Sequence, residues 1–283
     1  MSSKKIASGS ARAAQSEISP GFRVRSYRIA KEELESGYKA TMLSTNPAPR
    51  PGDGHVHLWL WSLDPSSTDL EACWQSLSPD ESRRADSFRF EKHRKRFVLA
   101  RGRLRFILAD YIGCRAEEVS FGYGAAGKPH SLTQPESWRL DFNLSHSEDS
   151  AALAVSSEME LGVDIELIRP IEEDILPQIL SAAEQRQFET LPAARQGDIL
   201  LESWTRKEAC LKALGTGLGG SPARFEFDLA RSDDDALLRV GESADEAAQW
   251  LVRTFLAPGP CRGAVAARAK GWSLLAMPPA ERP

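Results

Sequence analysis

Cysteine and long apolar runs are what this sequence of 283 residues has least of. Its 4 cysteines are scattered and form no Cys-x-x-Cys pair, which argues against a zinc site or a disulfide framework and indicates a reducing cytoplasm. No apolar run reaches the length of about eighteen residues that crosses a membrane. Residues 1–19 also lack the apolar core of a signal peptide. We therefore expect a cytoplasmic protein that does not bind membranes.

Negative charge outnumbers positive charge outside the first part of the chain. The formal net charge is -4, yet residues 1–52 hold nine Lys and Arg against four Asp and Glu. The remainder is acidic, which makes a general nucleic-acid binder a poor interpretation. Residues 1–52 are rich in Ser, Ala and Lys and end in the Pro-rich segment 46–52. We expect a basic, largely disordered extension followed by a linker.

The body of the chain contains two successive sets of strands and helices, which predicts an α+β fold in two halves, residues 53–158 and 159–283. The halves share no direct sequence repeat. Ser78 before Pro79 is typical of a helix start, and Gly113 and Gly215 are typical of helix ends. The expected long helices are 92–111, 172–190 and 197–214. The expected strands are 55–61, 140–144, 151–155, 162–167, 225–229, 237–240, 250–256, 263–267 and 272–276.

Two carboxylates, Asp164 and Glu166, lie two residues apart in the expected strand 162–167. They therefore share one face of the strand, roughly 6.5–7 Å apart, while the apolar residues between them occupy the other face. Alone, this pattern more often marks the solvated face of a half-buried strand.

A third carboxylate, Glu208, lies on the expected helix 197–214, with Lys212 one turn later. An exposed Glu–Lys pair is the simpler interpretation of this spacing. If Asp164, Glu166 and Glu208 converged, they would repel one another, and a cation would be needed to hold them together. Mg²⁺ is the natural candidate, since it prefers oxygen ligands and bridges carboxylates to phosphates.

Basic residues supply possible anion contacts. Arg94, Arg101 and Arg105 fall on one face of the helix 92–111, where a solvated cationic face is the simpler interpretation. Lys128 lies in the tight turn 127–129, where it could reach an anion. The strand end at 143–147 carries Ser145 and His146, for which structural and ligand-binding roles are equally favoured by the residues alone.

Four segments resemble, in order, the 4′-phosphopantetheinyl transferases of the long, single-chain type. They are 94–105, 127–129, 142–147, and the Gly-x-Asp-x-Glu of 162–166 followed by the Trp-x-x-Lys-Glu-Ala-x-x-Lys of 204–212. The resemblance implies two pseudo-symmetric α/β halves in one chain, with coenzyme A in the cleft between them. It also implies transfer of the phosphopantetheine arm to an apo acyl or peptidyl carrier protein of fatty-acid, polyketide or nonribosomal peptide synthesis. The released product would be adenosine 3′,5′-bisphosphate.

The same resemblance implies roles for the residues that match its motifs. Asp164, Glu166 and Glu208 would bind Mg²⁺. Glu208 would also be the base for the carrier serine, and Lys212 would neutralise or protonate the leaving phosphate. The residues implied in coenzyme A binding are Arg84, Arg101, Lys128, Pro129, Asn143, Ser145, His146, Asp164 and Lys212, with His146 near the 3′-phosphate.

Two other functions compete with this interpretation. A Mg²⁺-dependent pyrophosphohydrolase would use water in place of the carrier serine. A coenzyme A-binding or scaffolding protein with a decayed site would need no chemistry, but Asp164, Glu166, Glu208 and Lys212 are all intact. A monomer is expected from the resemblance, and residues 1–52 lie outside it.

Overall fold

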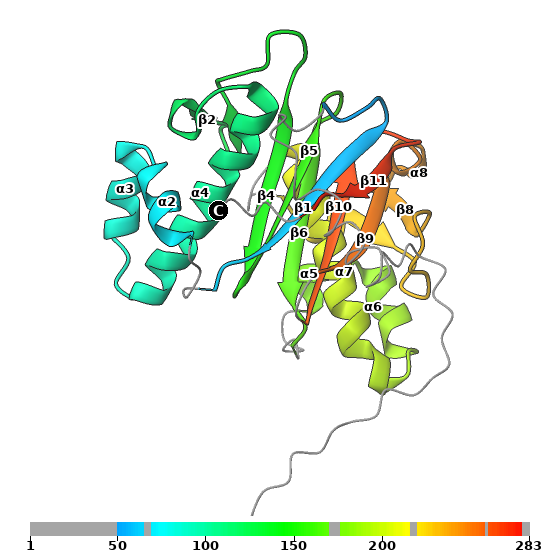
Figure 1. Ribbon diagram of the computed structural model, residues 1–283. Helices are drawn as coiled ribbons and strands as arrows, with labels where there is room; N and C mark the ends of the chain where they lie inside the picture. The colour runs from blue at the N-terminus through cyan, green and yellow to red at the C-terminus, as the bar shows by residue number, and fades with distance from the viewer. Residues whose placement is uncertain (1–49, 65–68, 170–175, 216–219, 258–259, 279–283) are drawn as a thin grey trace, which may run out of the picture.

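Two long helices enclose two stacked sheets, which gives an α+β chain of four layers (Figure 1). The structure is a computed structural model that describes residues 50–64, 69–169, 176–215, 220–257 and 260–278. The expected extension therefore lies almost entirely outside the described residues. The outer layers are helix α4 (Glu91–Ile112) and helix α7 (Ala193–Leu214). None of the described helices is long and apolar enough to cross a membrane.

Each half repeats one strand arrangement. The first half contains β1 (His55–Ser62), β4 (Asp141–Ser147) and β5 (Ser150–Ser156), hydrogen-bonded in the order β1-β5-β4. The second contains β6 (Leu161–Leu167), β9 (Leu251–Ala257) and β10 (Cys261–Ala267), in the order β6-β10-β9. All these pairs are antiparallel. The pseudo-symmetry implied by the resemblance is thus visible in the topology, without a sequence repeat.

Short elements connect these strands. Each half has a small hairpin after its long helix, formed by β2 (Phe121–Tyr123) with β3 (Pro129–Ser131) and by β7 (Phe225–Phe227) with β8 (Leu237–Val240). Strand β11 (Ser273–Ala276) returns to the first half and pairs in parallel with β1. The remaining short helices are α2 (Leu70–Gln75), α3 (Pro79–Asp86), η1 (Ala116–Glu118), α5 (Leu176–Ile179), α6 (Ala182–Glu189), η4 (Pro222–Arg224) and α8 (Ala244–Ala247).

The predicted helix 172–190 is wrong in its extent. Among the described residues its range holds two short helices, α5 and α6, and α7 begins at Ala193, before the expected start. The break arises because Ser181 caps α6: its side chain accepts a hydrogen bond from Glu184 N, while the Glu184 side chain accepts one from Ser181 N. This reciprocal capping box starts a new helix. Residues 172–175 lie outside the described part of the chain.

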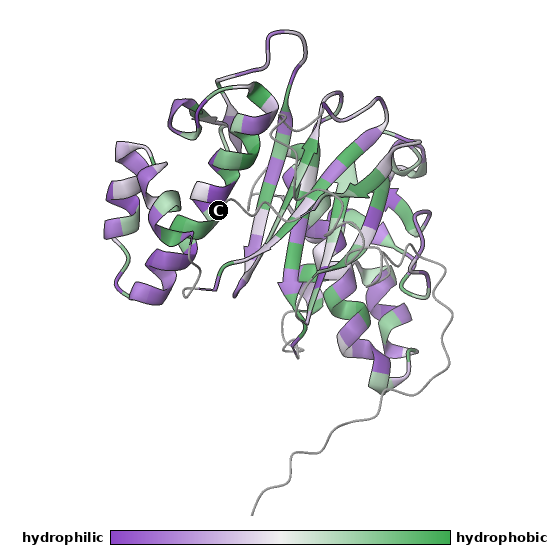
Figure 2. Cartoon of the chain, in the orientation of Figure 1, coloured by the Kyte–Doolittle hydropathy of each residue, from purple (hydrophilic) through white to green (hydrophobic). Residues whose placement is uncertain are grey.

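Alternation along the strands divides the interior into layers. On β6, the apolar Val163 and Ile165 pack with Val56 and Leu58 of β1 in a core between the two sheets. Trp59 and Trp61, on the opposite face of β1, pack in a second core that includes residues of α4. Figure 2 shows the hydrophobic residues along the central strands, while α3 at the periphery is mostly hydrophilic. The polar face of β6 is consequently turned toward α7.

One buried glutamate anchors each long helix. Glu81, in the capping box of α3, accepts from Arg105 Nε of α4 at 2.6 Å. Glu184, in the capping box of α6, accepts from Lys207 Nζ of α7 at 2.5 Å. Both ion pairs are buried, where losing one partner would leave the other charge uncompensated. Each pair therefore fixes a long helix against the short helix that precedes it.

Gly162 allows α7 to lie directly against β6. A Cβ atom at this position would lie 2.1 Å from Ala209 O and 2.4 Å from Ala213 N, both in the backbone of α7. Backbone atoms cannot yield as a flexible side chain can, so only glycine permits this approach. The helix residues between these contacts are thereby held beside the polar face of β6.

We expect Gly162→Ala to lower the free energy of unfolding by about 1–3 kcal/mol, because the added methyl group would push α7 away from β6. Gly197→Ala on the same helix is the matched control, since its Cβ would meet nothing within 4 Å. The control should instead stabilise the protein by about 0.5–1 kcal/mol. Urea denaturation measures both, and a Gly162→Ala midpoint equal to that of the wild type would contradict the packing argument.

A buried histidine joins β1 to α4. His57 is 5% exposed, and its Nδ1 lies 2.7 Å from the Tyr111 hydroxyl, which also accepts from Trp59 Nε1 at 2.9 Å. Because the tyrosine hydroxyl accepts from Trp59, its own proton is available to a neutral His57. Burial is the main cause that lowers the pKa of His57 from 6.5 to about 4, and the nearby His55 lowers it further.

Acid should therefore destabilise the fold through His57. Its folded pKa lies below its unfolded value, so the stability that comes from the neutral ring is complete above pH 6.5 and is lost as the pH falls through about 4. At about 1.4 kcal/mol per pH unit of difference, the loss reaches about 3 kcal/mol. Chemical denaturation at pH 7 and pH 4 should show a smaller loss for His57→Gln, and equal losses in both proteins would rule out this contribution.

Candidate active site

The two sheets meet along side-chain hydrogen bonds between β4 and β6, which belong to different sheets. Asn143 Oδ1 accepts from Val163 N at 2.8 Å. Two residues further along β4, Ser145 Oγ donates to Asp164 Oδ1 at 3.1 Å. Alternation places both β4 side chains on the face turned toward β6. Each of these contacts therefore fixes one residue of β6 relative to the first half.

Ser147 continues this row. Its hydroxyl donates to Glu166 Oε2 at 2.9 Å and accepts from Leu167 N at 3.2 Å. The other Glu166 oxygen lies 3.4 Å from Trp204 Nε1 of α7. We call the contacts of Asn143, Ser145 and Ser147 with β6 the polar seam. It holds Asp164 and Glu166 between the two halves, on the side of α7.

Lys212 binds the centre of the polar seam. Its Nζ lies 2.6 Å from Asp164 Oδ1 and 2.9 Å from Ser145 Oγ. Asp164 is 3% exposed, and its second oxygen, Oδ2, is buried without a hydrogen-bond partner among the described residues. Burial is the main cause that raises the pKa of Asp164, and the Lys212 charge opposes this. A buried carboxylate with one uncommitted oxygen is suited to binding a further cation.

Glu208 lies one helical turn before Lys212 and beside the same carboxylates. Burial is the main cause that raises the pKa of Glu208, and the negative charges of Asp164 and Glu166 raise it further. The positive charge of Lys212 opposes this rise. Glu208 makes no hydrogen bond or ion pair with any residue that the structure describes. Its carboxylate is therefore a half-buried proton acceptor without a partner.

These oxygens fit a Mg²⁺ ion by chemistry, and the ion itself stays a prediction. Asp164 Oδ2 and the Glu208 carboxylate are uncommitted hard donors, the ligand type that Mg²⁺ prefers. Within the described ranges, however, no three Asp, Glu, His or Cys side chains are already gathered as a metal-binding cluster. Two carboxylates with water and substrate oxygens are sufficient for Mg²⁺.

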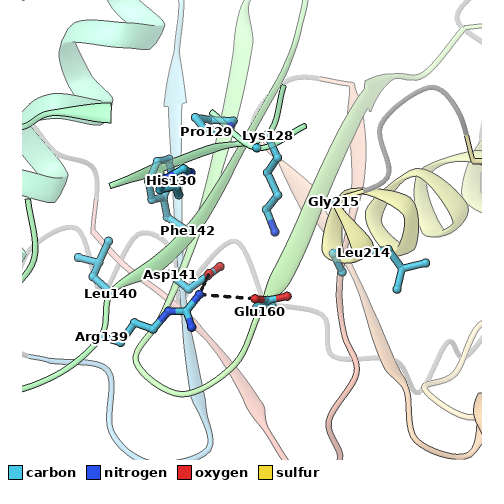
Figure 3. A pocket seen from close by; sticks show the side chains of 12 residues that line it. Lys128, Pro129, His130, Arg139, Leu140, Asp141, Phe142, Glu160, Leu214 and Gly215 are labelled. Carbon is cyan, nitrogen blue, oxygen red and sulfur yellow. Dashed lines mark hydrogen bonds and ion pairs between the residues drawn. The ribbon is translucent and has the colours of Figure 1, made fainter. Parts of the chain in front are cut away.

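A cavity of about 370 Å³ opens at one end of the polar seam. Lys128 and Pro129 of the β2–β3 hairpin line one side, and Leu214 and Gly215 at the end of α7 line another (Figure 3). It therefore lies between the two halves. The predicted ligand contacts Lys128 and Pro129 are both at this cavity.

Charged side chains meet inside the cavity. Figure 3 shows Lys128 pointing toward Asp141 and Glu160, and Lys128 Nζ donates to Leu161 O at 2.8 Å. Arg139 forms an ion pair of 3.5 Å with Glu160 and lies 4.0 Å from Asp141. Burial lowers the pKa of Lys128 and raises that of Asp141. Asp141 Oδ1 is buried without a hydrogen-bond partner in the described chain, so the cavity holds both a cation and an available acceptor.

His146 lies on the opposite face of β4 from Ser145. Its side chain keeps an exposed edge, yet the loss of water around the ring is the main cause that lowers the pKa of His146. The positive charges of Lys212, Arg96 and Arg84 lower this pKa further, and Glu166 opposes them. These cations come from α7, α4 and α3. The predicted contacts His146 and Arg84 thus share one positively charged neighbourhood, while Ser145 belongs to the polar seam.

The structure corrects the expected solvated face of α4. Arg101 and Arg105 are 8% and 1% exposed, and each forms an ion pair with Glu81. Arg105 also donates to Ala116 O and Val119 O, both at 2.9 Å. The physical reason is that Glu81 offers a buried negative charge, which two solvent-facing arginines would leave unpaired. Arg101 is therefore placed as a structural cation rather than at the cavity. Asn143, another predicted ligand contact, is engaged with Val163 N.

The sequence analysis did not predict four residues that the structure places at the site. Ser147 and Trp204 both contact Glu166, and Asp141 and Glu160 line the cavity. Trp204 begins the motif 204–212, and only the contact with Glu166 shows that it belongs to the site. The alternation of β4 places Asp141 on the same face as Ser145, so its position could have been anticipated from Ser145.

Known proteins match both halves of the chain. The family model described as "4'-phosphopantetheinyl transferase superfamily" matches residues 160–266. The model described as "4'-phosphopantetheinyl transferase, N-terminal" matches residues 60–158. The two matched ranges meet between β5 and β6.

Individual relatives carry the same description. The "4'-phosphopantetheinyl transferase HetI" of Nostoc sp. is 34% identical over 219 residues, which cover 77% of this chain and 89% of that protein. The "4'-phosphopantetheinyl transferase psf-1" of Bacillus pumilus is 32% identical and covers 60% of this chain and 70% of its own length. The human "L-aminoadipate-semialdehyde dehydrogenase-phosphopantetheinyl transferase" is 27% identical over 59% and 57%. The chain therefore belongs to the 4′-phosphopantetheinyl transferase superfamily.

Proposed function

We propose that this protein transfers the 4′-phosphopantetheine arm of coenzyme A to a serine of an apo carrier protein, with Mg²⁺ as cofactor and adenosine 3′,5′-bisphosphate as the released product. The observation that carries the proposal is the contact of Lys212 with Asp164, next to the Glu208 carboxylate. This contact lies close to the end of α7 that lines the cavity. A cation and a proton acceptor thus lie one turn apart on α7, and the end of the same helix lines the cavity.

The cavity between the halves supports binding of the nucleotide. Lys128 supplies a positive charge inside it, and Pro129 and Leu214 supply apolar walls. His146 lies outside the lining of the cavity, near Lys212, Arg96 and Arg84. Arg96 is already paired with Glu148 and Asp149, so His146 and Arg84 are the groups that we propose for an anionic group such as the 3′-phosphate. The pyrophosphate would then extend along the polar seam toward Lys212.

The transfer step is displacement at phosphorus, for which positioning and charge neutralisation are the main requirements. The serine oxygen of the carrier bonds to the phosphorus attached to pantetheine, and the bond from that phosphorus to the bridging oxygen breaks. Glu208 accepts the serine proton as the oxygen attacks. Lys212 neutralises the charge that develops on the departing adenosine 3′,5′-bisphosphate.

Asp164 and Glu208, with Glu166 beside them, would hold the Mg²⁺ ion. When bound, the ion would neutralise and orient the pyrophosphate oxygens. Before that, Lys212 compensates the buried Asp164 charge at 2.6 Å. Ser145 and Ser147 keep both β6 carboxylates aimed toward α7.

The proposed partners follow from the reaction. Coenzyme A supplies the arm, and an acyl or peptidyl carrier domain supplies the serine. Carriers of fatty-acid, polyketide and nonribosomal peptide synthesis are the proposed class, and a monomer in the cytoplasm remains the expectation.

Intact mass spectrometry tests the function directly. The protein is incubated with coenzyme A, Mg²⁺ and an apo carrier protein, and we expect the carrier to gain one phosphopantetheine arm while adenosine 3′,5′-bisphosphate appears. Omitting Mg²⁺ in the presence of a chelator should prevent both changes. Cleavage of coenzyme A with an unmodified carrier would replace the proposal with a pyrophosphohydrolase, and no change of either would overturn both.

Glu208→Gln separates chemistry from stability. We expect the transfer rate to fall at least about 100-fold, the usual contribution of a general base. The free energy of unfolding should not fall, because burial and neighbouring carboxylates raise the pKa of Glu208 and so make its ionised form unfavourable in the fold. Binding of adenosine 3′,5′-bisphosphate, measured by calorimetry, should be unchanged.

Glu189→Gln is the matched control, since Glu189 is exposed at the end of α6. It should transfer at the wild-type rate. Wild-type turnover by a folded Glu208→Gln protein would remove Glu208 from the reaction.

A further inference from the structure

Arg101 is tied at both ends of its guanidinium, and neither partner lines the cavity. Its Nε donates to Glu81 Oε1 at 2.5 Å, and its Nη2 donates to the Tyr123 hydroxyl at 2.6 Å. The guanidinium carbon also lies 4.3 Å from the centroid of the Phe121 ring. Tyr123 and Phe121 both belong to β2, so one buried cation of α4 contacts the first strand of the β2–β3 hairpin through two side chains.

The other end of this link is rigid. Glu81 Oε2 accepts from Ser78 N at 2.9 Å and from Arg105 Nε at 2.6 Å. The carboxylate is thereby held by a helix cap and a second buried arginine. Arg101 cannot shift without disturbing a charge network that is nearly excluded from solvent. It therefore provides a fixed point for the hairpin.

Tyr123 connects Arg101 to the turn that carries Lys128. In the hairpin register, Tyr123 lies opposite Pro129. The next residue, Gly124, donates its N–H to Lys128 O at 3.0 Å. Tyr123 itself is 56% exposed, so little packing holds its ring. Its hydroxyl bond to Arg101 ties this end of the hairpin to α4, while Lys128 Nζ itself donates to Leu161 O at the start of β6.

The hairpin needs such an anchor because it is small. It is a separate two-stranded sheet with strands of three residues each, and isolated hairpins are at best marginally stable in water. Phe121 packs against Phe142 with ring centroids 5.8 Å apart and secures the far end. The end that lines the cavity is tied to α4 through Tyr123 and to β6 through Lys128, and only the first of these ties fixes the backbone of β2 beside the turn.

We propose that Arg101, acting through the Tyr123 hydroxyl, is a positioning residue that sets where Lys128 and Pro129 stand at the cavity and so determines affinity for the nucleotide part of coenzyme A. This inference rests on the proposed function, because it takes the cavity to be the nucleotide site. Arg101 touches no ligand in this arrangement, and its effect is on binding rather than on the transfer step.

Tyr123→Phe is the sharpest test, since it removes one exposed oxygen and leaves the ring. We expect the KM for coenzyme A to rise at least about tenfold with kcat changed by less than about twofold, the effect expected when one hydrogen bond from a charged donor supports binding only. Calorimetry with adenosine 3′,5′-bisphosphate should show a matching loss of affinity. Leu132→Ala, an exposed site just after β3, is the control and should leave both values unchanged.

Arg101→Lys completes a double-mutant cycle. Lysine keeps a positive charge for Glu81 but lacks the planar fork that reaches two partners at once, so it should raise KM about as much as Tyr123→Phe. The double variant should be no worse than either single variant, because both remove one link. A purely structural Arg101 would lower the thermal midpoint without changing KM.

The outcomes separate this inference from the proposed function. If the wild type modifies the carrier while Tyr123→Phe keeps the wild-type KM and nucleotide affinity, the positioning role is wrong and the function stands. Additive effects in the double variant would also overturn the link. If the wild type neither modifies the carrier nor binds adenosine 3′,5′-bisphosphate, the proposed function fails first.

Discussion

The polar seam is the constraint from which the site follows. A carboxylate such as Asp164 is costly to bury unless hydrogen bonds and a cation compensate it, and here Ser145 and Lys212 supply both. Lys212 belongs to the same half as Asp164, whereas Ser145 comes from the first half, so the compensation is complete only when the halves are docked. Asp164 is thus a part of the interface as well as of the proposed chemistry. Its second oxygen remains uncommitted, as a ligand-binding carboxylate requires.

The two halves share a scaffold but not a chemistry. Each has a capping-box glutamate paired with a cation of its long helix, Arg105 in α4 and Lys207 in α7. The β6 face toward α7 carries Gly162, Asp164 and Glu166, whereas the β1 face toward α4 carries His57 and two tryptophans. The first half therefore packs its long helix against aromatic residues, whereas the second half places carboxylates between its sheet and its long helix. This difference explains why, among the described residues, the carboxylates of the candidate site come from the second half.

Local patterns in the sequence predicted most of the strands, both long helices and the shared face of Asp164 and Glu166, because strand alternation and helix periodicity are local properties. Contacts between distant segments were not accessible in this way. The burial of Arg101 depends on Glu81, twenty residues earlier, and the parallel pairing of β11 with β1 has no local signal. The break between α5 and α6 does have a local signal, because Ser181 and Glu184 have the spacing of a capping box. The family resemblance supplied the proposed roles, while the geometry shows which protein groups Asn143 and Arg101 bind within the fold.

The pairing of β11 with β1 also bears on how the protein is made. The first half leaves the ribosome early, but one edge of its sheet gains its neighbour only after β10 has been synthesised. Until then β1 presents unpaired backbone groups, which invite association with other chains. Nascent chains stalled before residue 273 would consequently carry an open sheet edge, and we expect a chaperone to be most useful during that interval.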